Sequence, residues 1–310
     1  MRSTHTVAWL LLTAIAAAPH ACAAGDLDAG PSGVEALQRE RFALITLVDA
    51  DSGHPGGDRE LVAQAWFVEH EGADRAEVLR LLGVPEGAFV DPAVPTDACV
   101  VDTRDLLAGS RGPDDVRLLD AGELLLEWGG AAEMLDSHYI PDVYRGVGGL
   151  AYDGVFPGSR AFEAALPLTI RADGSDEVAE LAVSVTPPPA VRVHAVIGEP
   201  IAEHQAVLPE GALDEPLRVT WGRADPGASD LSVVLLERRG FDRVATVSCV
   251  VEDDGEFTIP QAALQRLPLD LGPDQTDRLL VQRLRAVSFT APGLPDGMAF
   301  AIARDWVHLE

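Results

Sequence analysis

The chain has 310 residues, and its 50 acidic and 23 basic residues give it a formal net charge of −27. A surface this acidic repels the phosphates of nucleic acids and anionic lipids, so the composition argues against nucleic acid as a partner. Hydrophobic residues make up 47% of the chain, which is too many for a disordered protein. The length that remains after a leader is enough for two domains.

The first 24 residues have the three-part pattern of a secretory signal peptide. Arg2 supplies the positive charge, residues 7–18 form an apolar run, and small residues follow up to position 24. A run of twelve apolar residues is too short to span a bilayer as a helix. We therefore expect an exported protein that resides in the periplasm, on the outer membrane as a lipoprotein, or outside the cell.

Two processing routes fit the end of this segment. The sequence Ala21-Cys22-Ala23 matches the small-x-small rule for signal peptidase, which would release a chain beginning at Ala24. In the other route Cys22 becomes the lipidated first residue, as in bacterial lipoproteins, although Pro19 stands where their processing motif has an aliphatic residue. Residues 25–40 begin with small and polar residues, as a flexible tether does. Contact with a membrane is expected only through a lipid on Cys22.

Residues 41–186 are predicted to form a mixed, mostly β domain with one short helix. Apolar runs bounded by turn residues indicate the strands, and apolar residues three apart between charges indicate the helix. The expected helix is 73–82, and the expected strands are 42–48, 61–68, 98–101, two within 116–128, 144–152, 164–170 and 178–185. The last two strands flank a turn at 172–175 and should form a hairpin.

Residues 187–190 are the predicted linker between the two domains. They contain three consecutive prolines, which cannot join a central strand and favour a stiff, extended chain. Beyond them, short strands are separated by Gly, Pro and Asp turns, and we expect these strands at 217–221, 231–236, 244–251, 256–259, 278–289 and 298–307. This spacing predicts that residues 191–310 form a β-sandwich, so that the protein as a whole is mainly β.

The second half also resembles the immunoglobulin-like and fibronectin-III-like domains of bacteria. Trp221 lies in an alternating strand, Cys249 precedes the segment 253–260 (DDGEFTIP), and residues 261–267 follow as a helical turn before the next strand. The whole chain, signal included, is similar to uncharacterised secreted proteins and lipoproteins of GC-rich Gram-negative bacteria. The resemblance implies an immunoglobulin-like sandwich and no catalytic residues.

Asp49, Asp51 and Glu60 are the candidate metal ligands. They fall at positions 1, 3 and 12 of an EF-hand-like count, and carboxylates are hard oxygen ligands that suit calcium. Gly53 and His54 stand where that loop has a ligand and its turn glycine. The alternative is an acidic turn between two strands. Calcium is the cofactor hypothesis that these three residues offer.

Other polar and aromatic residues carry weaker hypotheses. A zinc site could be built from His194, Glu199 and His204. Their spacing matches no rule for zinc ligands, and the alternative is that these histidines are solvated. His70 and His138 are single histidines and more often packed or exposed than ligating. Four aromatic residues could form a sugar-binding platform or could instead pack in hydrophobic cores, namely Trp66, Tyr139, Tyr144 and Trp221.

Cys99 and Cys249 are the two cysteines outside the leader. They could pair in an oxidising compartment, but they lie far apart in the sequence and nothing in it brings them together. We expect two buried, unpaired cysteines that pack as small apolar residues.

The sequence contains no nucleophile elbow, Walker loop, zinc-protease motif or dinucleotide fingerprint, and we assign no catalytic residue. We expect a non-enzymatic envelope protein that serves as a binding or structural module with an unknown protein or glycan partner. One alternative is a secreted glycan or peptide hydrolase with its carboxylates in the first domain. Another is calcium-dependent adhesion through the Asp49 loop.

Overall fold

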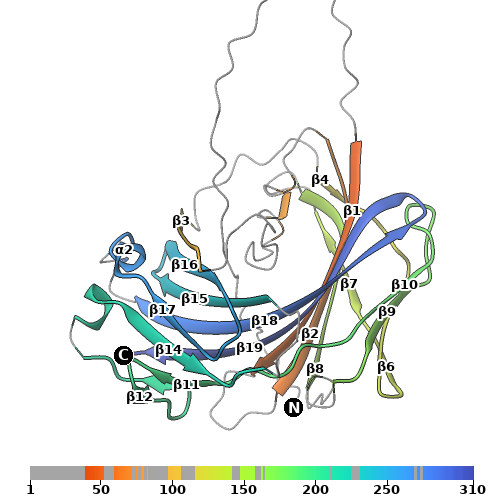
Figure 1. Cartoon of the computed structure of the whole chain (residues 1–310). Helices are drawn as coiled ribbons and strands as arrows, with labels where there is room; N and C mark the ends of the chain where they lie inside the picture. Colours follow the sequence, from red (N-terminus) through yellow and green to blue (C-terminus); the bar gives the residue numbers. More distant parts are fainter. Residues whose placement is uncertain are drawn as a thin grey trace, which may run out of the picture.

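The structure is a computed structural model of the chain (Figure 1). It describes residues 39–51, 59–71, 75, 78–79, 82, 97–105, 116–141, 147–157, 162, 165–209, 211–224, 231–268, 271–272 and 275–310. The signal peptide, Cys22 and the tether up to residue 38 lie outside these residues, so the predictions made for them stay predictions.

The described residues are mainly β, as the sequence predicts. The strands are β1 (Arg39–Asp51), β2 (Arg59–Glu71), β3 (Cys99–Asp105), β4 (Val116–Leu118), β5 (Leu124–Trp128), β6 (Ala131–Met134), β7 (Asp136–Ile140), β8 (Val147–Pro157), β9 (Leu168–Ala172), β10 (Leu181–Val185), β11 (Val193–Val196), β12 (Glu199–Pro200), β13 (Gln205–Ala206), β14 (Leu217–Trp221), β15 (Leu231–Arg239), β16 (Arg243–Val251), β17 (Glu256–Ile259), β18 (Thr276–Ala291) and β19 (Leu294–Leu309).

Helical structure is short. The 3-10 turn η2 covers Ala212–Asp214 and the helix α2 covers Gln261–Leu264. Within the predicted helix 73–82, residues 75 and 78–79 are helical, and the amide of Leu82 donates a hydrogen bond to the carbonyl of Val78. Among the described residues no helix is long and apolar enough to cross a membrane.

The strands form one large sheet and two small ones (Figure 1). The large sheet has the order β3-β16-β15-β18-β19-β1-β2-β4-β8-β7, with β13 added beside β19. The small sheets have the orders β10-β9-β5-β6 and β12-β11-β14-β17. In Figure 1 the first small sheet lies at the right and the second at the left, and the long hairpin β18–β19 extends from one side to the other.

One face of the large sheet, which we call the inner face, packs against both small sheets. Every second side chain of a strand points to the same face, and on β1 Ala43 and Ile45 point inward and are fully buried. They belong to a single apolar cluster that also contains Ile170 of one small sheet and Val219 of the other. One continuous hydrophobic core therefore joins the three sheets.

The opposite, outer face of the same strands is also buried near the middle of the sheet. Phe42 and Leu44 of β1 point to it and belong to a second apolar cluster with Val78 and Leu79 of the predicted helix. Strands that are buried on both faces have near-continuous apolar sequences. This explains why residues 42–48 show no alternation of apolar and polar types.

The two predicted domains share the large sheet and its core instead of forming separate sheets. β1 pairs in parallel with β19, from Phe42 opposite Asp296 to Asp49 opposite Ala303. β3 pairs with β16 at the far end of the same sheet. The linker at 187–190 was predicted from local proline content, whereas these pairings join distant parts of the chain and leave no local signature.

A disulfide joins Cys99 of β3 to Cys249 of β16. The two residues stand directly opposite each other in the antiparallel pair, with their Cα atoms 4.1 Å apart. The expectation of two unpaired cysteines is wrong, because strand pairing brings together thiols that are 150 residues apart in the sequence. The bond attaches the edge strand β3 covalently to the rest of the sheet.

Arg283 of β18 holds the end of the predicted linker against the large sheet. Its side chain is 1% exposed, and its Nε donates to Asp253 Oδ2 at 2.5 Å. Its Nη1 donates to the carbonyl of Ala190 at 2.7 Å, and its Nη2 donates to the carbonyl of Gly222. The guanidinium thus ties three separate segments to β18 at a buried position.

Arg285, two residues further along β18, holds the start of the linker. Its Nη1 donates to the carbonyls of Thr186 and Pro187, at 3.2 and 3.1 Å. The proline segment is therefore docked on the large sheet and is not a free spacer between two domains.

We predict that Arg283→Met destabilises the protein by about 3–5 kcal/mol, because it leaves the carboxylate of Asp253 without its charged partner at a largely buried position. Chemical denaturation of the purified protein measures the free energy of unfolding. The control is Arg218→Met, which removes an exposed ion pair with Glu256 and should change stability by less than about 1 kcal/mol. Adding Asp253→Asn to Arg283→Met should recover part of the loss, and equal losses for the two arginine variants would contradict the assignment.

Candidate functional site

The consecutive strands β6 and β7 lie at the surface of the molecule, within residues 131–140. β6 is the last strand of one small sheet and β7 is the last strand of the large sheet, so each leaves one edge without a partner strand among the described residues. Every residue of both strands is exposed. Leu135 between them is buried and its amide donates to the carbonyl of Leu124 at 2.9 Å. We call β6, β7 and the neighbouring Val155 of β8 the open edge.

Apolar side chains gather at the open edge. Four of the six large apolar side chains that are exposed among the described residues lie there, namely Met134 (53% exposed), Tyr139 (71%), Ile140 (36%) and Val155 (39%). A strand edge with unpaired backbone groups and exposed apolar side chains is a surface on which a second extended chain can pair. The geometry of the open edge is therefore that of a binding surface.

Two carboxylates and one imidazole lie on the outer face of this edge. Asp136 of β7 stands directly opposite Asp153 of β8, and His138 Nε2 lies 2.8 Å from Asp153 Oδ1. Burial raises the pKa of Asp153, the neighbouring His138 lowers it, and Asp136 raises it again. Like charges that are directly opposite on paired strands repel. A cationic side chain brought to this position would relieve that repulsion.

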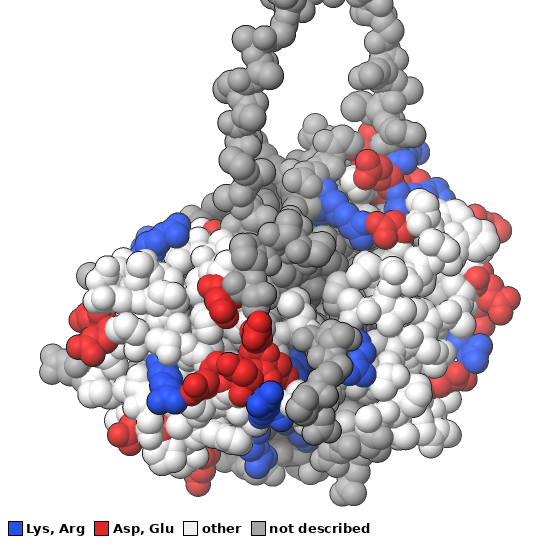
Figure 2. Space-filling view, viewed as in Figure 1, with Lys and Arg blue, Asp and Glu red and all other residues white. Residues whose placement is uncertain are grey.

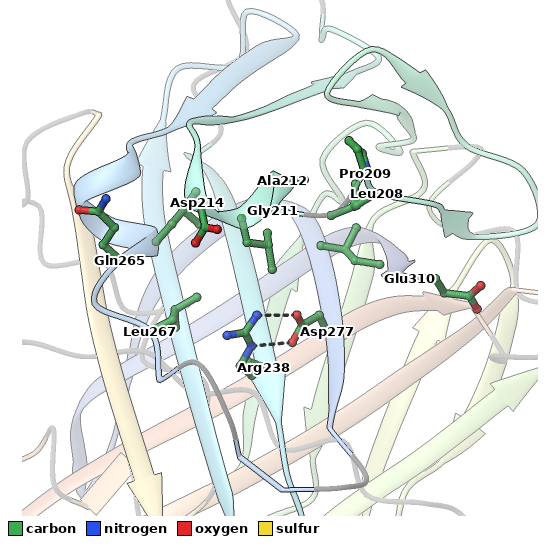
Figure 3. A pocket seen from close by; sticks show the side chains of 13 residues that line it. Leu208, Pro209, Gly211, Ala212, Asp214, Arg238, Gln265, Leu267, Asp277 and Glu310 are labelled. Carbon is green, nitrogen blue, oxygen red and sulfur yellow. Dashed lines mark hydrogen bonds and ion pairs between the residues drawn. The ribbon is translucent and has the colours of Figure 1, made fainter.

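A cavity of about 580 Å³, which we call the end pocket, lies where β15, β18 and β19 end near η2 and α2 (Figure 3). Arg238 of β15 and Asp277 of β18 form a bidentate ion pair in its lining, with Nε donating to Oδ1 at 2.9 Å and Nη2 to Oδ2 at 2.8 Å. Nη1 of Arg238 donates to the carbonyl of Pro268 at 2.7 Å. Five leucines make most of the apolar lining, namely Leu208, Leu213, Leu264, Leu267 and Leu309.

A row of polar side chains crosses the outer face of the large sheet at the same end. The register places Thr246, Glu237, Arg278 and His308 side by side on β16, β15, β18 and β19. Burial raises the pKa of Glu237 and lowers that of Arg278, because it penalises the charged form of each group, and their mutual attraction opposes both shifts. None of these residues lines the end pocket, so the row is a separate feature inside the sheet.

The face of the molecule in Figure 2 carries acidic and basic side chains next to one another, with wide uncharged areas between them. Elsewhere in the described chain, an exposed ion pair joins Arg218 of β14 to Glu256 of β17. The strongly negative net charge of the chain therefore does not appear on this face as one uniform acidic surface.

The predicted calcium ligands are not brought together. Asp49 is 4% exposed, and its Oδ2 lies 2.7 Å from Nη2 of Arg59. In the register of β1 and β2, Asp49 and Glu60 fall on alternating positions and so point to opposite faces of the sheet. The side chain of Asp51 is outside the described set. Among the residues that the structure describes, no group of three or more His, Cys, Asp or Glu residues could hold a metal ion.

The histidines of the sequence analysis are dispersed. His194 and Glu199 are exposed on β11 and β12, whereas the His204 ring stacks on Trp306 at 5.1 Å between ring centres. These three residues do not form the zinc set that was considered. His70 is buried and packs edge-to-face against Phe42 at 5.7 Å, and His138 belongs to the open edge.

The predicted aromatic platform is also not assembled. Trp66 and Trp221 are buried, at 7% and 3% exposed, and serve two different apolar clusters. Tyr139 is exposed at the open edge, and Tyr144 lies outside the described residues. The role in hydrophobic cores, which was the alternative, accounts for both tryptophans.

The open edge and the end pocket were not predicted from the sequence. Residues 131–140 have no alternation to detect, because β6 and β7 are exposed on both faces. Tyr139 was noted there for a different reason. No family model matches this chain, and no curated protein is significantly similar to it. The function is therefore inferred from geometry.

We predict opposite shifts in the pKa of Asp153 for two substitutions at the open edge. Asp136→Asn should lower this pKa by removing a like charge, and His138→Gln should raise it by removing an attractive one. Carbon-13 NMR titration of the Asp153 carboxyl group measures both. Because the pKa of Asp153 is raised in the folded protein, ionisation of Asp153 opposes folding: stability falls as the pH rises from the pKa of the unfolded chain to that of the folded protein, and the loss is constant above it. Shifts in the same direction would contradict the described geometry.

Proposed function

We propose that this protein is an exported, non-enzymatic binding module of the cell envelope, and that it binds an extended segment of a partner protein at the open edge. The observation that carries the proposal is the exposure of every residue of β6 and β7, with four large apolar side chains beside a strand edge that no described strand covers. Pairing of a peptide with such an edge provides affinity through main-chain hydrogen bonds and specificity through alternate side chains.

Export is supported by the signal-like leader and by the Cys99–Cys249 disulfide. Disulfides form and persist in oxidising compartments and are rare in the bacterial cytosol. The two processing routes would give a mature chain that begins at Ala24 or at a lipidated Cys22.

We also propose that strands β11 to β19 are an immunoglobulin-like unit that has been extended by strands of the first half. Two layers face each other across an apolar interior, with Val219 of β14 on one side and Val234 of β15 on the other. Trp221 is buried between them, and its Nε1 donates to Asp253 Oδ1 at 2.8 Å. These contacts involve the residues on which the resemblance was based.

The charges of the open edge favour a partner strand with a basic side chain. If the partner strand runs antiparallel to β7, two consecutive apolar residues of the partner would stand opposite Ile140 and Tyr139. The third partner residue after this apolar pair would then stand opposite Asp136. An arginine at that position would be attracted by Asp136 and Asp153. The partner motif is therefore apolar, apolar, any, any, arginine.

The hydrolase hypothesis has less support in this geometry. Asp136 and Asp153 face each other, but Asp136 is exposed on the last strand of the sheet and lines neither the end pocket nor another described cavity. Calcium-dependent adhesion has no supporting arrangement around Asp49. We propose neither as the function.

We predict that the mature protein isolated from its native host begins at Cys22 or Ala24. Intact-mass spectrometry with peptide mapping separates the alternatives, because a lipidated Cys22 carries a large added mass and a chain starting at Ala24 carries none. A chain that retains residues 1–21 in the cell envelope or the medium would contradict export by this leader.

We predict that a synthetic peptide with the sequence Thr-Val-Val-Thr-Thr-Arg-Thr shifts the backbone amide NMR signals of residues 131–140. Replacing its arginine by glutamate should weaken binding about two- to fivefold, the size expected for one cross-strand charge pair. Asp136→Asn should reduce the difference between the two peptides, and the charge of Asp153 should preserve the remainder. Asp173→Asn, which changes an exposed acid in a distant turn, is the matched control and should preserve the difference.

Two outcomes would overturn the binding proposal. One is that neither peptide shifts the backbone amide NMR signals of residues 131–140, and that the Tyr139→Asp substitution leaves the other signals of the spectrum unchanged. The other is a stable dimer of the purified protein in sedimentation analysis that Tyr139→Asp dissociates, because the open edge would then be occupied by a second copy of this chain.

A further inference from the structure

The end pocket carries an inference that does not depend on the open edge. Its volume of about 580 Å³ is within the range of small-molecule sites, and five leucines with Pro209 and Ala212 give it an apolar lining. An apolar cavity of this size favours a ligand with an apolar body, because burying that body removes its surface from water.

The positive charge of Arg238 in the pocket lining is already paired with the carboxylate of Asp277. Arg238 is the only basic residue among the described residues of the lining, and it is 7% exposed, with donors directed to Asp277 and to the carbonyl of Pro268. This pair is electrically neutral as a unit. The pocket therefore offers no unpaired cation to an anionic ligand.

Two further acidic residues line the cavity at its exposed margin. Figure 3 shows Asp214 and Glu310 on opposite sides of the cavity, with the Arg238–Asp277 pair between them. Both residues are exposed, and Glu310 Oε1 accepts a hydrogen bond from Gln205 Nε2 at 3.2 Å. The charge at the mouth of an apolar cavity is thus negative.

We propose that the end pocket binds a small amphipathic cation, with its apolar chain among the leucines and its positively charged group near Asp214. The attraction to Asp214 orients the ligand with its charged group at the mouth of the pocket, and the leucines bury its apolar part. The end pocket would thus bind a small molecule, and this binding is independent of protein binding at the open edge.

Three probes with the same ten-carbon chain test the proposal by isothermal titration calorimetry below their micelle concentrations. Decyltrimethylammonium should bind more tightly than decyl glucoside, and decyl glucoside more tightly than decanoate. Asp214→Asn should weaken decyltrimethylammonium about two- to fivefold and leave decyl glucoside unchanged, as expected for one partly solvated charge pair. Glu215→Gln, which removes an adjacent exposed acid outside the lining, is the matched control and should have no effect.

A filling variant locates the binding. Ala212→Trp places a large ring in the cavity and should abolish binding of all three probes while circular dichroism shows a folded protein. The proposal is overturned if none of the probes binds the wild-type protein, if decanoate binds as tightly as decyltrimethylammonium, or if Ala212→Trp binds the probes unchanged. None of these outcomes affects the peptide experiment at residues 131–140.

Discussion

The pairing of β18 with β19 is the interaction on which the rest of the structure depends. Each strand has 16 residues, longer than most strands of globular proteins. At about 3.3 Å per residue the hairpin is roughly 50 Å long, enough to lie beneath both small sheets. One part of it pairs with β15 and another with β1, so the first and second halves of the chain are joined in one sheet.

Arginine and proline complement each other at the centre of this arrangement. Residues 187–189 have no backbone N–H and present only carbonyl acceptors, and buried carbonyls need donors. A guanidinium has five N–H donors and no acceptor. Arg283 and Arg285 of β18 therefore supply what the proline segment lacks, and Asp253 balances the charge of Arg283. A segment with the composition of a spacer becomes a fixed part of the structure.

The parts of this fold that could be predicted are those with a local signal. Residues 217–221 and 256–259 alternate between the core and solvent, and both strands have the predicted bounds. The hairpin of β9 and β10 follows from its turn. Gly149 lies within β8, where a Cβ atom would overlap the carbonyl of Leu118.

The parts that could not be predicted depend on contacts between distant residues. The Cys99–Cys249 bond and the pairing of β1 with β19 span 150 residues or more. Asp49 was a plausible ligand by spacing, but the facing arginine is visible only once β1 and β2 are paired. The open edge was hidden because its strands face solvent on both sides, and the end pocket because its lining comes from several separate segments.

The parallel pairing of β1 with β19 also constrains when this chain can fold. β1 ends at Asp51 and its neighbour β19 begins at Leu294, so β1 cannot gain this partner until the long stretch of chain between the two strands has been synthesised. Contacts between such distant segments form slowly, because a long loop must close first. This late central pairing suits the export that we propose, because an exported chain crosses the membrane before it folds.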